Sequence, residues 1–180
     1  MCLIVTGPGM TNILTAMGQA FADSVPMLVI SSVNRTEQLA MRQGRLHELR
    51  SQQSVVAGVA AFSHTLLHPS QLPEVLARAF TLFASARPRP VHIEIPIDVI
   101  TAPADHLPLS PRPVPNSPGP APEAIARVVA LLAKANSPLL VIGGGAVPAA
   151  TEALVLAERL DTPVINTVNE VVAEEPFVRR

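Results

Sequence analysis

Apolar positions recur along the first part of the chain with two spacings, one typical of buried strands and one typical of amphipathic helices. A β-branched run, Leu3–Val5, predicts a strand, and Met27–Ile30 predicts another. Between them, Thr11 or Asn12 is expected to cap a helix that runs to about Asp23 with its apolar residues on one face. A strand, a helix and a strand within about 30 residues form a βαβ unit, which predicts parallel pairing.

The pattern continues through a polar connection into a second strand, helix and strand. Arg35–Arg50 mixes charges with little periodicity and is interpreted as a long connection. The remaining elements are a strand over Phe62–Leu67, an amphipathic helix over Ser70–Ser85 and a strand over Val91–Ile95, which Pro96 ends. His92 and Glu94 alternate with apolar residues in that last strand, so we expect them to face solvent.

A proline-rich stretch divides the chain. Eight of the 22 residues from Thr101 to Pro122 are proline, which favours an extended, semi-rigid linker. After it the pattern predicts a helix over Glu123–Ala135, a strand over Leu139–Ile142, a tight turn at Gly143–Gly145, a helix over Pro148–Leu160 and a strand over Pro163–Thr167. The second part therefore shows the same alternation of helices and strands as the first.

These elements predict an α/β protein in three parts. Residues 1–100 form a domain with a parallel sheet, residues 101–122 form the linker, and residues 123–180 begin a second domain. Each predicted sheet has too few strands for a closed core. We therefore expect the chain to be an incomplete piece of a larger protein.

Composition narrows the class of protein. Of the 180 residues, 48% are hydrophobic and 15% are charged, which allows a sizeable core and argues against disorder. The net charge of -1 and the lack of Trp and Tyr offer nucleic acid neither a basic surface nor good stacking surfaces. No apolar stretch reaches the length of a membrane span, and we expect no secretory signal, because no basic start is followed by an apolar core and a small-residue cleavage site. The single cysteine, Cys2, excludes an intrachain disulfide, so a cytoplasmic location is expected.

The segment Thr6–Asn12 follows the first predicted strand and opens the first helix. Parallel α/β sheets bind ligands at this edge, where helix N-termini direct free N–H groups outward. Gly7 and Gly9 would permit close approach of a ligand to the backbone. Pro8 would stiffen the loop, and Asn12 would offer an amide. The alternative is a tight strand-to-helix turn in which Asn12 only caps the helix.

Three segments of the chain form a recognisable series. Thr6–Asn12 reads TGPGMTN, Asp23–Ile30 reads DSVPMLVI, and Arg87–Val99 reads RPRPVHIEIPIDV. In this order they resemble the pyrimidine-binding domain of acetolactate synthase-like thiamine diphosphate enzymes, which has roughly SGPGATN, then DSVP with an apolar strand, then RPGPV-IDIP-DV. The resemblance covers essentially the whole chain. It implies a parallel-sheet pyrimidine-binding domain that lacks its N-terminal part, followed by the beginning of a Rossmann-like central domain.

The resemblance also implies a cofactor and a partial site. In the family, the proline and asparagine of the first motif lie against the aminopyrimidine ring of thiamine diphosphate, which Pro8 and Asn12, with Gly7 and Gly9, would contact here. The glutamate that activates the cofactor belongs upstream, and magnesium is supplied by a third, C-terminal domain, so neither is expected in this chain. The resemblance therefore implies a fragment of a 2-oxo acid decarboxylase or acetolactate synthase-like enzyme, inactive alone, whose intact form is a homodimer or tetramer.

Arg45–Glu48 falls where the family often has a Phe-Gln-Glu segment facing the active-site cleft. His47 would handle protons near neutral pH, and Glu48 would pair with a cationic group of the substrate. A solvated loop with charge pairing between Arg45 and Glu48 is an equally open interpretation. Together with Ala57–His64, the Leu-His-Glu variant resembles the 5-guanidino-2-oxopentanoate decarboxylase branch, whose substrate is a keto acid derived from arginine.

Other chemistry has less support in the sequence. Gly143–Gly145 lacks the third glycine of a dinucleotide motif, so a structural turn is favoured over NAD, and FAD, which some family members bind, is unsupported. The five histidines, at positions 47, 64, 68, 92 and 106, have no ligand-like spacing and predict no metal cluster. Two alternatives stay open: a non-catalytic α/β binding or regulatory module, and a nucleotide-binding protein that uses the glycine loop.

Overall fold

The computed structural model describes residues 1–105, 107–108 and 110–167. The chain forms two units, unit 1 over Met1–Pro118 and unit 2 from Gly119 onward. The part of the predicted second domain that follows Thr167 lies outside the described residues, as does His106. Between Thr101 and Ala121 the described residues form no helix or strand.

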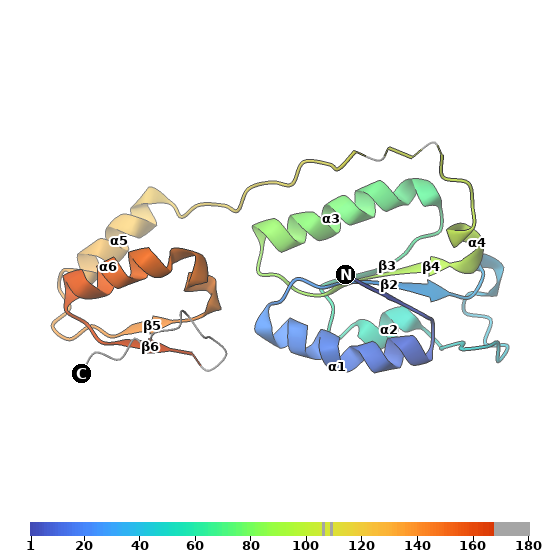
Figure 1. The fold of residues 1–180 in the computed structure, drawn as a ribbon, viewed down its shortest axis with the longest axis horizontal. Coiled ribbons are helices and arrows are strands. Elements are labelled where there is room, and N and C mark those ends of the chain that lie inside the picture. Colours follow the sequence, from blue (N-terminus) through green and yellow to red (C-terminus); the bar gives the residue numbers. More distant parts are fainter. Residues whose placement is uncertain (106, 109, 168–180) are drawn as a thin grey trace. The chain divides into compact units, whose positions relative to one another are not determined.

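Unit 1 is built on a four-stranded sheet. The strands are β1 (Cys2–Ile4), β2 (Leu28–Val33), β3 (Phe62–Thr65) and β4 (Val91–Pro96). They lie in the order β1-β2-β4-β3, and every pairing is parallel. β2 and β4 therefore occupy the centre of the sheet (Figure 1). The parallel α/β class is confirmed, and each strand predicted for this unit is present within a few residues of its expected bounds.

Helices cover both faces of this sheet. They are α1 (Pro8–Asp23), α2 (Gln52–Val56), α3 (Leu72–Ser85) and α4 (Ile97–Ile100), with short 3-10 helices at Thr36–Gln38 and Pro69–Gln71. α3 lies over one face of the sheet, and α1 and α2 lie over the other (Figure 1). The sequence does not predict α2 or α4, because neither is long enough to show a helical period. α2 begins where the Ser51 hydroxyl accepts a hydrogen bond from the Ser54 N–H.

The first helix begins earlier than predicted. Neither Thr11 nor Asn12 caps it, because α1 starts at Pro8 and Gly7 is its N-cap. The fixed φ of proline suits the first helical position, and Gly7 adopts a φ of 68°, which glycine tolerates. Asn12 therefore lies inside the helix, with its side chain exposed.

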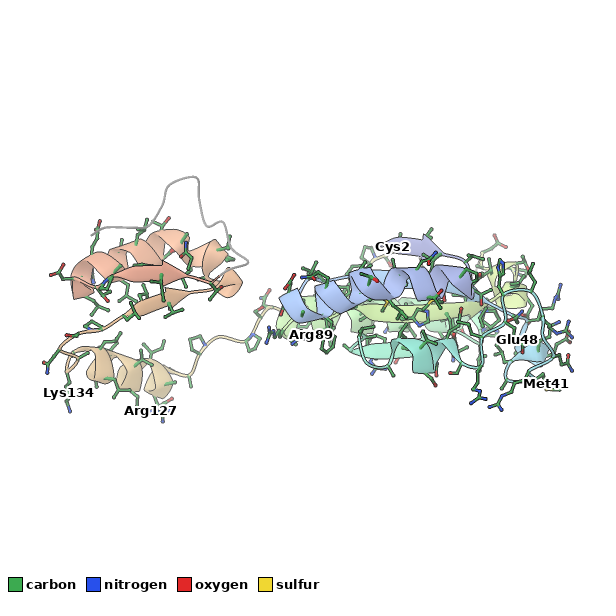
Figure 2. All side chains as sticks on the ribbon, turned by 90° about the horizontal axis from the view of Figure 1, so that it is seen from below. Cys2, Met41, Glu48, Arg89, Arg127 and Lys134 are labelled. Carbon is green, nitrogen blue, oxygen red and sulfur yellow. The ribbon has the colours of Figure 1, made fainter. Side chains whose placement is uncertain are left out.

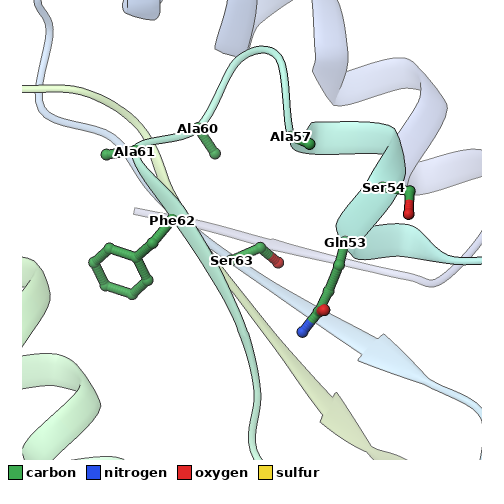
Figure 3. Close-up of a pocket in the computed structure, with 7 residues that line it drawn as sticks. All are labelled: Gln53, Ser54, Ala57, Ala60, Ala61, Phe62 and Ser63. Carbon is green, nitrogen blue, oxygen red and sulfur yellow. The ribbon is translucent and has the colours of Figure 1, made fainter.

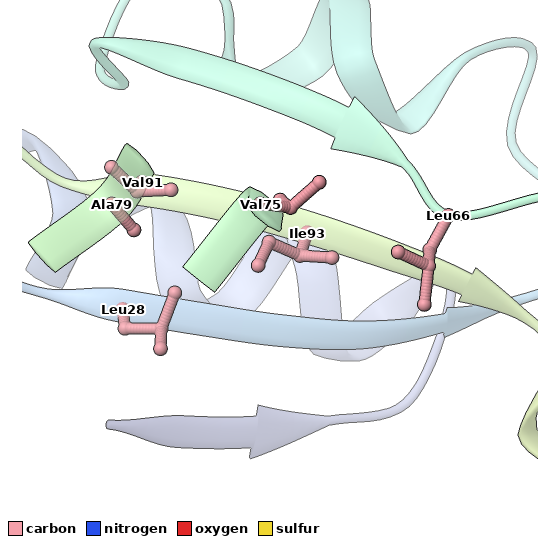
Figure 4. Close-up of a cluster of buried hydrophobic side chains, with 6 residues drawn as sticks. All are labelled: Leu28, Leu66, Val75, Ala79, Val91 and Ile93. Carbon is pink, nitrogen blue, oxygen red and sulfur yellow. The ribbon is translucent and has the colours of Figure 1, made fainter. Parts of the chain in front are cut away.

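Two apolar clusters hold the layers of unit 1 together. The cluster between the sheet and α3 consists of Leu28, Leu66, Val75, Ala79, Val91 and Ile93, all of them buried (Figure 4). The cluster on the other face consists of Met10, Met17, Val29 and Val56, each of them 0% exposed. Leu28 and Val29, successive residues of β2, point to opposite clusters, as the two-residue period of a strand requires.

The prediction that His92 and Glu94 face solvent is wrong. The two side chains are 0% and 6% exposed. Val91 and Ile93 of the same strand face α3, so His92 and Glu94 point to the opposite face, where Gln52 of α2 contacts Glu94. In a parallel sheet covered by helices on both faces, the polar residues of a central strand are as buried as its apolar ones.

The described residues of unit 2 form a two-stranded parallel sheet and two α-helices. Its elements are α5 (Pro122–Leu132), β5 (Leu140–Ile142), α6 (Ala150–Leu160) and β6 (Val164–Asn166). Pro122 occupies the first turn of α5, as the sequence predicts. A 3-10 helix, Gly144–Ala149, stands where a tight turn was expected. This 3-10 helix contains Pro148, where the next helix was expected to begin, and α6 begins after it at Ala150.

Leu66 and its neighbour Leu67 offer a matched test of the α3 cluster, because they are 2% and 51% exposed. Leu66→Ala is expected to lower the free energy of unfolding by about 2–5 kcal/mol, through lost burial and the cavity left behind. Leu67→Ala is expected to change it by no more than about 0.5 kcal/mol. Urea denaturation of both variants measures the difference, and equal effects would show that this cluster does not stabilise unit 1.

Candidate functional site

The turn between β1 and α1 has a backbone that only glycine accommodates. Gly7 has φ 68° and ψ -107°. A Cβ atom placed on it would lie 2.5 Å from the carbonyl oxygen of His47, closer than real Cβ contacts come. Gly7 therefore allows the chain at His47 to close over the turn.

Gly9 makes room for neighbouring atoms of the protein. A Cβ atom there would lie 3.0 Å from Cγ1 of Val5 and 3.4 Å from Cβ of Ile4. The glycine thus lets the first turn of α1 pack against the end of β1. Backbone contact of Gly7 or Gly9 with a cofactor stays a prediction.

Pro8 and Asn12 form the exposed face of the turn. The two residues lie four positions apart in α1, so they share one face of the helix, and both are exposed. Thr11 turns its hydroxyl back to the Pro8 carbonyl oxygen at 3.1 Å. The helix starts at the carboxyl edge of a parallel sheet, where such folds bind ligands. The resulting surface combines a rigid apolar ring with a carboxamide.

The connection between β2 and α2 folds back onto this turn. The Thr6 hydroxyl donates a hydrogen bond to the His47 carbonyl oxygen at 3.3 Å, and the Thr6 N–H donates to Ser32 Oγ at 3.2 Å. His47 itself has a left-handed backbone, with φ 59°. The structure therefore brings the predicted cofactor turn and the predicted substrate segment together, through the backbone of His47.

Glu48 lies beside His47 with its carboxylate held by the backbone. Its Oε2 accepts a hydrogen bond from the Arg45 N–H at 2.9 Å, and this bond is the main cause that lowers the pKa of Glu48 below its ordinary value. The expected pairing with Arg45 thus runs through the backbone, because the Arg45 guanidinium donates to Gln43 Oε1 at 2.9 Å instead. Glu48 and Met41 lie at the end of unit 1 where α1 begins (Figure 2). The segment places a negative charge next to the turn.

A buried hydrogen-bond network lies beneath the turn, on the sheet face that α1 and α2 cover. Its centre is Gln52, which is 3% exposed. The Gln52 Oε1 accepts a hydrogen bond from the Gly7 N–H at 3.1 Å. Its Nε2 donates to Glu94 Oε2 at 3.1 Å and to the Ser32 carbonyl oxygen at 3.1 Å. Glu94 Oε1 accepts a further hydrogen bond from the Thr65 hydroxyl at 2.6 Å, so the network joins the turn to strands β2, β3 and β4.

His92 extends this network along β4. Its Nδ1 lies 2.7 Å from Ser63 Oγ, and its Nε2 lies 2.8 Å from Ser31 Oγ. Burial lowers the pKa of His92 from its ordinary 6.5 to about 4, so the ring is neutral at physiological pH. A neutral imidazole donates through one nitrogen and accepts through the other, and two hydroxyls satisfy both. His92 is therefore a structural member of the core.

Sequence reasoning misses Gln52, Ser31 and Thr65. Ser31 and Thr65 could have been singled out as polar residues on strands of a parallel sheet, because helices bury both faces of such a sheet. Gln52 carries no such signal, because it lies in a helix too short to be predicted. Its role depends on contacts with residues far away in the sequence.

A separate hollow of about 390 Å³ lies beside α2 and the edge strand β3 (Figure 3). It is lined by Gln53, Ser54, Ala57, Ala60, Ala61, Phe62 and Ser63. The lining shares no residue with the turn or with the His47–Glu48 segment. The amide of Gln53 already donates to the Thr65 hydroxyl at 2.6 Å. The turn, not this hollow, is the candidate site.

The described part of the chain offers neither a cluster of metal ligands nor a membrane span. Within residues 1–105, 107–108 and 110–167, no three His, Cys, Asp or Glu side chains are placed to hold a metal ion. None of the helices in these ranges is both long and apolar enough to traverse a lipid bilayer.

Comparison with known proteins assigns the class. Residues 1–55 match the sequence profile of the family described as thiamine pyrophosphate enzyme, N-terminal TPP binding domain. The matched residues contain β1, the Gly7 turn, all of α1 and the His47–Glu48 segment. Residues 1–55 thus belong to the N-terminal domain family of thiamine pyrophosphate enzymes, and the chain is similar over most of its length to members of that class.

Individual proteins of this class are similar to the chain over most of its length. The chain is 48% identical over 170 residues to the Pseudomonas aeruginosa protein named probable 2-ketoarginine decarboxylase AruI, covering 93% of this chain and 30% of that protein. It is 35% identical over 175 residues to acetolactate synthase of Arthrospira platensis, with the same coverage of 93% and 30%. The chain thus spans about 30% of the length of these curated relatives. A solved structure from Mycobacterium smegmatis, assigned as a thiamin diphosphate-dependent enzyme, matches with a TM-score of 0.72 at 18% identity, over 92% of this chain and 32% of that one, which supports the fold.

Gly7→Ala tests the close approach between the turn and His47, with Gly44→Ala as the matched control. Both glycines have a positive φ, 68° and 69°, but a Cβ atom on Gly44 would meet nothing within 4 Å. Each variant is expected to lose at least about 1 kcal/mol because of its positive φ. Gly7→Ala should lose about 2 kcal/mol more, since His47 must move. Chemical denaturation measures both losses, and equal losses would contradict the close approach.

The buried His92 predicts a loss of stability in acid. Because its pKa falls from 6.5 in the unfolded chain to about 4 in the folded protein, the unfolded state takes up the proton first as the pH decreases. The stability that comes from keeping His92 neutral in the folded protein is fully present above pH 6.5 and is lost as the pH falls toward 4. Between neutral pH and about pH 4.5 the free energy of unfolding should fall by about 2–3 kcal/mol. Denaturation of the parent chain and of His92→Gln, whose side chain carries no titratable group, is measured across this pH range. The same pH dependence of the free energy of unfolding in both would disprove the contribution of His92.

Proposed function

We propose that this chain forms the pyrimidine-binding part of a thiamine diphosphate-dependent enzyme that decarboxylates or ligates 2-oxo acids. The observation that supports this most is the exposed pair Pro8 and Asn12, which share one face of α1 at the sheet edge within the matched residues 1–55. Relatives that match over 93% of the chain are named as a 2-ketoarginine decarboxylase and an acetolactate synthase.

The residues present fit the aromatic part of this cofactor. A flat aminopyrimidine ring needs a rigid apolar surface and hydrogen-bonding groups at its edge, which the Pro8 ring and the Asn12 carboxamide would supply. Bound thiamine diphosphate would supply the carbanion chemistry. The Gly7 turn, closed by His47 and bonded to Gln52, would keep Pro8 at a fixed position against the ring. Magnesium and the diphosphate would be held by residues outside this chain.

His47 and Glu48 are proposed to face a 2-oxo acid with a cationic end. Backbone N–H groups keep Glu48 ionised by lowering its pKa, and a carboxylate pairs well with a guanidinium. The exposed imidazole of His47 would exchange protons with the bound substrate. The 48% identity to a protein named for 2-ketoarginine, which is 5-guanidino-2-oxopentanoate, supports this substrate class.

The chain is proposed to be inactive alone. It spans about 30% of the length of its curated relatives, so most contacts with cofactor and substrate would come from other sequence. The intact enzyme is proposed to be a homodimer or tetramer. A cytoplasmic location is proposed because a single cysteine suits a reducing compartment.

Titration of the isotope-labelled chain with thiamine diphosphate and magnesium, followed by NMR, tests the proposal. Binding is expected to be weak, with a Kd of about 1 mM or above, because only part of the contacts is present. Amide shifts are expected at Gly7, Gly9 and Asn12. Asn12→Ala should reduce them, whereas Gln19→Ala, which removes another exposed carboxamide about two turns further along α1, should not.

Other outcomes of the same experiment distinguish the alternatives. Shifts at Gly143–Gly145 with NAD or FAD, and none with thiamine diphosphate, would indicate the nucleotide-binding protein. No shift with any of these ligands would indicate a non-catalytic module. Release of carbon dioxide from pyruvate or 2-ketoarginine by the purified chain, with magnesium and thiamine diphosphate, would refute the proposed inactivity.

A further inference from the structure

Gln52 holds the Gly7 turn from the buried side. As the N-cap of α1, Gly7 has no acceptor for its N–H within the helix, and the Gln52 Oε1 accepts it at 3.1 Å. Gln52 opens α2 and lies 45 residues along the chain from Gly7. It therefore makes a long-range contact to the residue whose backbone sets the direction of Pro8.

The amide of Gln52 has one orientation that satisfies its neighbours. The Gly7 N–H can only donate and the Ser32 carbonyl oxygen can only accept, so Oε1 must face Gly7 and Nε2 must face Ser32. Nε2 also donates to Glu94, whose other carboxyl oxygen is bonded by the Thr65 hydroxyl. A flipped amide would set two acceptors against each other in a buried site, at a cost comparable to losing both bonds.

We propose that Gln52 is a positioning residue for the cofactor site. Its hydrogen bonds fix the Gly7 backbone relative to strands β2 and β4. The Gly7 backbone in turn fixes the positions of the exposed Pro8 and Asn12. This inference rests on the function proposed for that turn. Gln52 is buried and is bonded to the turn through the Gly7 N–H, whereas β2 and β4 are held by their own parallel pairing, so its loss should free the turn while the sheet stays intact.

Hydrogen exchange at the Gly7 amide of the full chain tests the inference. Gln52→Met keeps the approximate length and bulk of the side chain and removes both of its polar atoms. Exchange at Gly7 should become roughly tenfold faster, while the amides of β2 and β4 keep their protection. The matched control is Gln53→Met, the next residue of α2, whose amide bonds Thr65 and not the turn. Gln53 reaches Gln52 only indirectly, through Thr65 and Glu94, so this variant should change exchange at Gly7 far less than Gln52→Met does.

Three results would overturn the inference. The first is a Gly7 amide that exchanges in the parent chain as fast as an unstructured one, which is informative even if the variant does not fold. The second is unchanged exchange at Gly7 in Gln52→Met. The third is an equal loss of protection at Gly7 and across β2 and β4, which would make Gln52 a core residue without a specific effect on the turn.

Titration of the same proteins with thiamine diphosphate separates this inference from the proposed function. Shifts at Asn12 in the parent chain that become smaller in Gln52→Met, although Gln52 does not touch that surface, would support both. Faster exchange at Gly7 in Gln52→Met, together with no shift in the parent chain, would support control of the turn by Gln52 and refute the proposed function.

Discussion

The close approach of the Gly7 backbone to the carbonyl oxygen of His47 is the constraint on which the candidate site depends. A side chain on Gly7 would need to occupy the space that this oxygen fills. The approach lets a connection some 40 residues away in the sequence close over the start of α1, with the Thr6 hydroxyl bonded to the same oxygen. Without it, the turn and the His47–Glu48 segment would belong to separate parts of the surface.

The second requirement is a polar layer inside the sheet. Buried polar groups are costly unless each finds a partner, and here Gln52, Glu94 and His92 bond to backbone groups, hydroxyls or one another. An apolar core would fill the same space, but it could not accept the N–H of Gly7. The polar layer therefore gives the turn a defined position relative to β2 and β4, and that is a property a binding surface needs.

Much of the fold follows from the sequence, because strands and long helices show their period in it. The parallel α/β class, the strands and the long helix α3 were predicted from that pattern. The start of α1 was not, since Gly7 and Pro8 adopt a cap geometry that carries no apolar period. The burial of His92 and Glu94 was not predicted either. Alternation of polar and apolar residues in a strand suggests that one side faces solvent, and the sequence does not show that helices cover both faces of this sheet. The residues of the site were singled out by resemblance, whereas the contact between Gly7 and His47 and the role of Gln52 emerge only in three dimensions.

The way His47 contacts the turn leaves its side chain free to vary. Gly7 is approached by the carbonyl oxygen, the Cα and the Cβ of His47, and every residue except glycine has these atoms. Glu48 is likewise held by a backbone N–H, that of Arg45. A different side chain that tolerates the positive φ of position 47 would therefore preserve the closed turn while it changed the chemistry offered beside it. Under the function proposed for this chain, the turn and the Gln52 network would therefore stay constant while the neighbouring segment would be free to differ in the groups it offers a substrate.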